Sequence, residues 1–169
     1  PVPQPGNALG DVAADSAAHA LAASSALPLD APTAGQAETV ELGLAGAEIG
    51  DGAPLTIFNI DTFRPGFVFP PAMGGLDGWL EVFKGEGANW SYVRPAPGPD
   101  PIALETAEKR PISDLCCTGL YHFARAGDFR RALAEERKAP QAKELYVAPL
   151  YNHLIREGAR IGYSLIERG

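Results

Sequence analysis

A short apolar run that ends in a single acid constrains the fold of this chain most. Residues 54–67 read PLTIFNIDTFRPGF, in which the run Leu55–Ile60 reaches Asp61 before Pro65-Gly66 breaks the chain. A run this short and apolar predicts a strand buried on both faces. Because ligands of α/β proteins bind at the carboxyl ends of strands, Asp61 is either a site residue or a cap on the turn that follows.

The segments around this strand predict an α/β fold. A short strand at Leu27–Leu29 and a helix from about Gln36 give residues 27–60 the strand–helix–strand order of a parallel sheet. Further strands are expected at 102–107, 114–124 and 161–167, and helices from Asp128 and across 148–160. We therefore expect a mostly parallel, Rossmann-like sheet with helices on both faces. An antiparallel hairpin flap is expected at 79–94, where Trp79–Phe83 and Trp90–Val93 flank a Gly-Glu-Gly turn.

The length of 169 residues allows one domain with a sizeable core. Residues 1–25 form a separate segment, with a loose Pro/Gly end followed by Ala-rich sequence that favours a helix at 11–26, with Asp11 as its N-cap. We assign residues 26–169 to the α/β domain. No internal repeat divides it.

The distribution of charge limits the partners. Residues 1–63 contain eight acidic residues and no Lys or Arg, and all 14 basic residues follow. A nucleic-acid partner is not expected, because binding its backbone needs a basic face. A membrane partner is not expected either, since no run approaches the roughly 18 apolar residues of a membrane span. Cys116 and Cys117 are adjacent and cannot join distant segments, which predicts a reducing, cytoplasmic setting.

Six separated stretches stand out in a fixed order: GQAETV, FNIDT, NWSYVR, AEKRPIS, CTGLYHF and ELYVAPLYNHLIREG, which together cover about residues 26–167. In their order and spacing they resemble the nucleotidylyltransferase family that makes nucleoside-diphosphate sugars and related activated compounds. The family includes glucose-1-phosphate thymidylyltransferases and a capsule-associated branch. The resemblance implies a nucleotidyltransferase-like (GT-A) domain that joins an NTP to a phosphorylated sugar or similar acceptor and releases pyrophosphate.

The resemblance also implies roles for residues at the nucleotide end of the site. Gly35 and Gln36 match the segment in which a Gln reads the base, and Asp61 matches the catalytic acid that holds Mg²⁺. A divalent cation on oxygen ligands offsets the repulsion between two reacting phosphates. The structural alternatives are a plain first helical turn at Gln36 and a turn cap at Asp61.

For the acceptor end, the resemblance implies that Glu108 holds polar groups of the acceptor and that Lys109 meets its phosphate. An ammonium suits this task because it is a compact point charge. Gly119 is expected where the backbone passes close to the ligand, with Tyr121 nearby. The alternatives are a surface ion pair at Glu108–Lys109 and a purely structural strand at Gly119–Tyr121. Tyr146 is interpreted as packing, and no zinc site is expected because His122 and His153 lack partners at metal spacing.

The chain departs from the family pattern at both ends. The glycine-rich loop with its Arg and Lys has no counterpart, and the second metal-binding Asp would follow the last helix. The sequence therefore predicts a domain that is incomplete at both ends and has little turnover by itself, because several triphosphate-binding groups are missing. A non-catalytic binding module and a nucleotide-sugar glycosyltransferase remain as alternative functions.

Overall fold

The computed structural model describes residues 26–167, and the loose end and helix expected in residues 1–26 lie outside it apart from Ala26. The chain divides into two units, Pro1–Asp30 and Ala31–Gly169. In the first, the strand expected at Leu27–Leu29 is wrong, because these residues have no regular structure and both leucines are exposed. Pro28 has no N–H to donate to a strand partner, which explains the difference.

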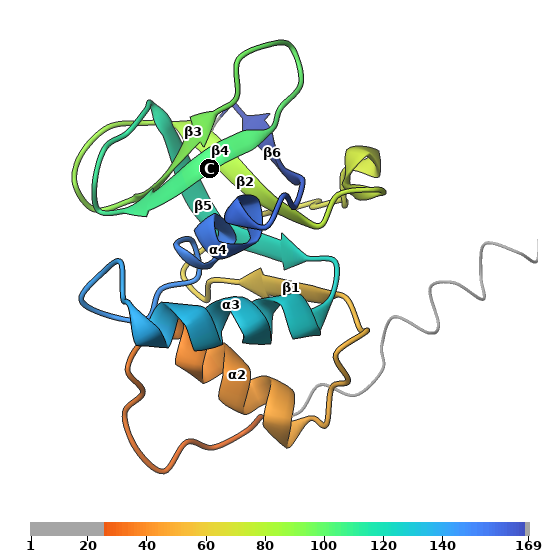
Figure 1. Ribbon diagram of the computed structural model, residues 1–169, viewed down its shortest axis with the longest axis vertical. Coiled ribbons are helices and arrows are strands. Elements are labelled where there is room, and N and C mark those ends of the chain that lie inside the picture. The colour runs from red at the N-terminus through yellow and green to blue at the C-terminus, as the bar shows by residue number, and fades with distance from the viewer. Residues whose placement is uncertain (1–25, 168–169) are drawn as a thin grey trace, which may run out of the picture. The chain divides into compact units, whose positions relative to one another are not determined.

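A six-stranded sheet forms the centre of the second unit (Figure 1). The strands run in the order β4-β3-β5-β2-β6, and β1 also pairs with β5. Their bounds are Leu55–Phe58 for β1, Gly78–Lys84 for β2, Ser91–Pro95 for β3, Ala103–Glu108 for β4, Leu115–Phe123 for β5 and Ile161–Ile166 for β6. The long, apolar β5 lies at the centre because almost all its residues are buried and it has partners on both edges.

The predicted α/β class is confirmed, but the strand directions differ from the prediction. β5 is antiparallel to β1, β2 and β3, and β3 is antiparallel to β4. Among the described strand pairs only β2–β6 is parallel. The expected predominance of parallel pairs is therefore wrong, since residues 26–35 contain no strand and form no strand–helix–strand crossover with β1. The expected 79–94 hairpin is also wrong, because β5 lies between β2 and β3.

The described α-helices pack into one core on one face of the sheet. They are α2 (Gln36–Gly46), α3 (Ala126–Lys138) and α4 (Leu150–Arg156), and their buried residues join the inward side chains of β2 and β5 in a single apolar cluster. The opposite face carries Glu81 and His122, which contact Arg64 and Phe69 of the segment that contains the 3-10 turn η2 (Pro71–Met73). The prediction of helices on both faces is therefore wrong for the described residues.

The helix starts and ends follow local chemistry. α2 begins at Gln36, as predicted, and α4 follows Pro149 and stops before Gly158, whose φ of 88° suits glycine. α3 begins two residues before Asp128. Instead of capping the helix, Asp128 binds Arg125 and Arg131, each at 2.8 Å. No described helix is long and apolar enough to cross a membrane.

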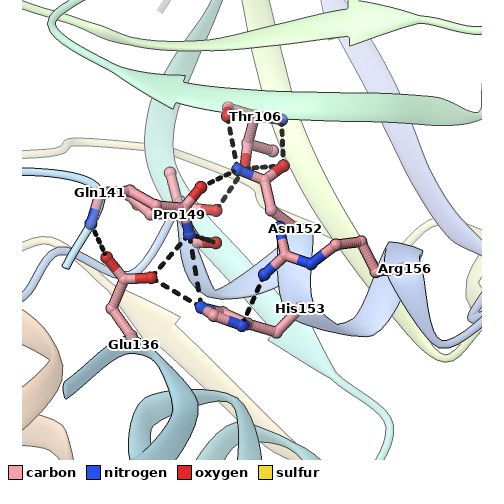
Figure 2. A network of polar contacts seen from close by, with 8 residues as sticks. Thr106, Glu136, Gln141, Pro149, Asn152, His153 and Arg156 are labelled. Atoms are coloured by element: carbon pink, nitrogen blue, oxygen red, sulfur yellow. Dashed lines mark hydrogen bonds and ion pairs between the residues drawn. The ribbon is translucent and has the colours of Figure 1, made fainter. Parts of the chain in front are cut away.

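A buried polar network joins β4, α3 and α4 (Figure 2). Asn152 of α4 accepts a hydrogen bond from the backbone N–H of Thr106 and donates one to its carbonyl, both at 2.8 Å. Glu136 of α3, 1% exposed, accepts hydrogen bonds from the backbone and side chain of Gln141, each at 2.6 Å. His153 lies 2.7 Å from the Glu136 carboxylate.

The partners of His153 settle which of its nitrogens carries hydrogen. Its Nδ1 lies 2.7 Å from the guanidinium of Arg156, which can only donate, so Nδ1 accepts. Nε2 therefore donates to Glu136. No buried side-chain nitrogen or oxygen lacks a partner in the part of the chain that the structure describes. We call the buried residues Thr106, Glu136, Asn152 and His153, together with the exposed Gln141 that binds them, the buried network.

Candidate active site

The candidate site is a gap along one edge of β5. β1 ends at Phe58 opposite Leu120, and β3 begins at Ser91, one residue before the Tyr92–Cys116 pair. Both strands run along the same edge of β5 and leave Cys117, Thr118 and Gly119 between them. A cavity of about 980 Å³ opens here. Side chains that line it include Gln36, Asn59, Asp61, Thr62, Phe83, Trp90, Ser91, Glu108, Lys109, Cys117, Thr118, Tyr121 and Tyr146.

Gly35 and Gly119 permit the close approach of the chain at the α2 end of the cavity. Gly35 has a φ of 145°, and a β-carbon there would lie 2.7 Å from the backbone of Leu145. Gly119 has a φ of 94°, and a β-carbon would lie 2.5 Å from the Asn59 amide. Gln36 donates a hydrogen bond to the Asn59 side chain across this gap. The start of α2 is thereby tied to the end of β1.

The turn that carries Asp61 is fixed to the sheet by its neighbours. Thr62 donates its hydroxyl to the Thr118 carbonyl at 2.7 Å and its N–H to the Asn59 carbonyl at 3.0 Å. Arg64 binds the buried carboxylate of Glu81 through two hydrogen bonds of 2.9 Å. Arg64 is therefore engaged in holding the turn, while Asp61 itself is exposed and lines the cavity.

Glu108, the last residue of β4, and Lys109, which follows it, lie at the other end of the cavity. Ser91 donates a hydrogen bond to the Glu108 carboxylate, and burial raises the pKa of Glu108. Lys109 donates to the Tyr146 hydroxyl at 2.6 Å, and this bond raises the pKa of the ammonium. Lys109 has a left-handed φ of 52°, which is uncommon for a residue with a side chain. Such strain is often found at functional sites.

Aromatic side chains form an apolar wall beside this charged pair. The rings of Phe83 and Trp90 meet edge to face with centroids 4.9 Å apart, and Trp90 is 40% exposed. Burial raises the pKa of the Tyr121 hydroxyl and of the Cys117 thiol. Cys117 is therefore protonated at neutral pH and suits packing rather than nucleophilic chemistry.

Asp61 would fit a magnesium ion whose other ligands were phosphate oxygens and water. The described residues contain no group of three or more His, Cys, Asp or Glu side chains that could hold a metal. Mg²⁺ commonly uses one or two carboxylates, with phosphate oxygens and water as its other ligands. One exposed carboxylate at the cavity matches that pattern.

The cavity brings together the residues that sequence reasoning singled out. Gln36, Asp61, Glu108, Lys109, Gly119 and Tyr121 line it, and Gly35 directly precedes Gln36. Asp61, Glu108 and Lys109 meet here because β1 and β3 lie end to end along β5, and β4 pairs with β3. The individual roles stay predictions. Sequence reasoning missed Asn59 and Ser91 as partners of Gln36 and Glu108, and it assigned Tyr146 to packing.

Comparison with known proteins yields structural relatives. No family model matches the sequence, and no curated protein does either. The nucleoside-diphosphate-sugar pyrophosphorylase from Vibrio cholerae RC9 is 50% identical, with a TM-score of 0.78 over 83% of this chain and 60% of that one.

Two further structures share the fold at 16% identity each. One is a provisionally assigned glucose-1-phosphate thymidylyltransferase from Bacillus anthracis in complex with a sucrose, with a TM-score of 0.61 over 83% of this chain and 56% of that one. The other is an apo UDP-glucose pyrophosphorylase, with a TM-score of 0.56 over 79% of this chain and 52% of that one. This chain therefore spans less than two thirds of the length of each of the three structures.

Proposed function

We propose, on the premise that this chain belongs to the nucleotidylyltransferase family, that the complete protein transfers a nucleotidyl group from an NTP to a phosphorylated sugar or similar small molecule. In this reaction an oxygen of the acceptor phosphate attacks the α-phosphorus of the NTP. The bond from that phosphorus to the bridging oxygen breaks, and pyrophosphate leaves with the electron pair. The observation that carries the proposal is the convergence of Gln36, Asp61, Glu108 and Lys109 on one cavity.

Gln36 and Asn59 form the nucleotide end of the proposed site. Because Gln36 donates only one of its hydrogens to Asn59, its carbonyl oxygen and second N–H remain to read a base edge. Gly35 allows this end of α2 to pack against the backbone of Leu145. The amide is thus held in place before a nucleotide enters.

Asp61 lines the same cavity and is proposed to hold Mg²⁺. When bound, the ion offsets the repulsion between the acceptor phosphate and the α-phosphate. The chain's own contribution is to hold the turn that carries Asp61, through Thr62 on the Thr118 carbonyl and Arg64 on Glu81. Arg64 has no role as a phosphate ligand in this proposal.

Glu108 and Lys109 form the acceptor end. The ammonium of Lys109 has three N–H donors and gives one to Tyr146, which leaves two for phosphate oxygens. The Glu108 carboxylate accepts hydrogen bonds from hydroxyl or other N–H and O–H groups of the acceptor molecule. The exposed Trp90 covers an apolar side of the acceptor molecule. A cytoplasmic setting belongs to this proposal and is supported by the adjacent Cys116 and Cys117, which form no disulfide.

The test is pyrophosphate release by the complete protein with a panel of NTPs and sugar 1-phosphates in the presence of Mg²⁺. The proposal expects release with at least one pair, and its loss in Asp61→Asn. Tight binding of both compounds without any release would instead support a non-catalytic binding module. Release of a nucleoside diphosphate from a nucleotide sugar would support a glycosyltransferase and contradict the proposal.

A further inference from the structure

The segment Leu145–Tyr146 touches both ends of the cavity. The backbone of Leu145 pairs with the turn before α2, because its N–H donates to the Ala34 carbonyl at 3.0 Å and its carbonyl accepts from Ala37 at 2.8 Å. The neighbouring Tyr146 extends its hydroxyl to Lys109. Two adjacent residues therefore contact the nucleotide end through the backbone and the acceptor end through a side chain.

Tyr146 holds the ammonium of Lys109 in two ways. Its hydroxyl accepts a hydrogen bond from Nζ at 2.6 Å, and Nζ lies 4.8 Å from the centre of its ring, within the range of a cation–π contact. A lysine side chain has many rotamers, and its ammonium is otherwise mobile at an exposed position. This contact orients the ammonium and leaves its other two N–H groups available to bind a phosphate.

The place of Tyr146 is set by its own surroundings. Leu145, Val147 and Ala148 on either side of it are buried, and Leu145 is fixed by the two backbone hydrogen bonds to the α2 turn. Lys109 is fixed at its backbone, where its N–H donates to the Trp90 carbonyl at 2.9 Å. The hydroxyl and the ammonium therefore meet between two anchored backbones.

We infer that Tyr146 is a positioning residue for the acceptor phosphate, which it serves by holding the Lys109 ammonium toward the cavity. The inference rests on the proposed function, since it concerns the same acceptor end. The hydroxyl acts through Lys109 and does not itself touch the phosphate. The pKa of Lys109 is raised, chiefly by its hydrogen bond to the Tyr146 hydroxyl, and this direction agrees with the contact.

The test compares Tyr146→Phe, Lys109→Ala and the double variant in the complete protein. Tyr146→Phe keeps the ring and removes only the hydroxyl, and Tyr163→Phe is a matched control at a half-buried tyrosine of β6 outside the cavity lining. Calorimetry measures the dissociation constants of glucose 1-phosphate, inorganic phosphate and NTP. We expect Tyr146→Phe to weaken both phosphate probes about fivefold, as the loss of a charge-assisted hydrogen bond predicts.

Two further readouts separate positioning from a general structural effect. Binding of NTP should be unchanged in Tyr146→Phe, and the pKa of Lys109, measured by NMR of its labelled side chain, should fall. In the background of Lys109→Ala, Tyr146→Phe should cause no additional loss of phosphate affinity.

The outcomes distinguish this inference from the proposed function. If Lys109→Ala leaves phosphate binding unchanged, the assignment of the acceptor end is wrong and the inference falls with it. If Lys109→Ala weakens binding but Tyr146→Phe leaves it unchanged or tightens it, the inference alone is overturned. An equal loss from Tyr146→Phe with and without Lys109 also overturns it, because the tyrosine would then act independently.

Discussion

Thr106 and Glu108 lie two residues apart on the same face of β4, yet their side chains belong to different polar assemblies. Thr106 lies under α4 and joins the buried network, in which Asn152 satisfies both its N–H and its carbonyl (Figure 2). Glu108 lies beyond the cover of α4 and lines the cavity. Strand alternation places both on one face, and the extent of the helix decides which of them reaches the cavity.

The difference between the two assemblies lies in how their polar groups are satisfied. The buried network pairs Glu136, Gln141, Asn152 and His153 with one another and with the backbone. At the cavity, Asp61 and Lys109 are exposed, and Gln36 and Lys109 keep donors available. A polar group that is buried and fully paired stabilises the fold, whereas one that is held at one end and open at the other can bind a ligand.

The largest expected effect is on stability, from His153→Leu. The substitution removes one of the three donors to the buried Glu136 carboxylate, and losing a hydrogen bond to a buried charged group costs about 3 kcal/mol. Urea denaturation should show this loss in the free energy of unfolding. The folded fraction should still bind glucose 1-phosphate within about twofold of wild type. A large loss of affinity with normal stability would mean that the network belongs to the site.

Asp61→Asn is expected to show the reverse pattern. Turnover of the complete protein should fall about 100-fold or more, because a residue that stabilises developing charge is lost. The free energy of unfolding should change by less than about 0.5 kcal/mol, since Asp61 is exposed. Steady-state kinetics and denaturation measured on the same preparation check both values. Loss of stability together with activity would favour the turn-cap interpretation of Asp61.

Glu108 should give acceptor binding a pH dependence. Its pKa is raised by burial, so the carboxylate takes up a proton at a higher pH than a free glutamate. As the pH falls through this raised pKa, donor groups of the acceptor lose their charged partner and affinity should fall several-fold. Calorimetric titrations across acidic pH should show the inflection in wild type and a flat profile in Glu108→Gln.

The same shift has a consequence for stability with a defined sign. A carboxyl whose pKa is raised on folding favours the fold while it is protonated, and this contribution is lost as the pH rises through the folded pKa. Glu108→Gln should therefore be more stable than wild type at neutral pH, and the difference should shrink below the usual pKa of glutamate. An unchanged difference across this range would contradict the assigned burial effect.

The smallest expected effect is a change in stability at Lys109, which separates the strain of its backbone from its role in binding. Because its φ of 52° is costly for a residue with a side chain, Lys109→Gly should raise the free energy of unfolding by about 1 kcal/mol. Lys109→Ala keeps the strain and should not. Both variants should bind glucose 1-phosphate more weakly, and Lys109→Arg should not fully restore binding. Equal stability of the glycine and alanine variants would show that the backbone is not strained there.

The sequence predicted the elements better than their arrangement. The runs that become β2 to β6 were visible from their apolar or alternating content, which is a local pattern. Leu55–Ile60, which we expected to be buried on both faces, instead forms β1 with Thr56 and Phe58 exposed. Strand pairing depends on contacts between distant segments. The local sequences of β2 and β3 therefore could not show that β5 lies between them. Leu27–Leu29 shows the same limit, since an apolar triplet becomes a strand only where it has a partner.

At the site, the residue types were predictable and their partners were not. A carboxylate at a strand end and a Glu-Lys pair before Pro111 stand out in the sequence. Tyr146 does not, because its position on an apolar stripe hides the one polar atom that contacts Lys109. Glu136 did carry a signal, since it lies on the same helical face as Ala132 and Leu133, where a charged residue must find buried partners.

The most direct test of the central claim, that the cavity and not the buried network is the functional site, is backbone NMR mapping of two ligands. Glucose 1-phosphate should shift the amides of Glu108, Lys109 and Tyr146, and NTP with Mg²⁺ should shift those of Gln36 and Asp61. The amides of Asn152 and His153 should stay unchanged with both ligands. Shifts confined to the α4 region, with none around Asp61 and Lys109, would contradict the account.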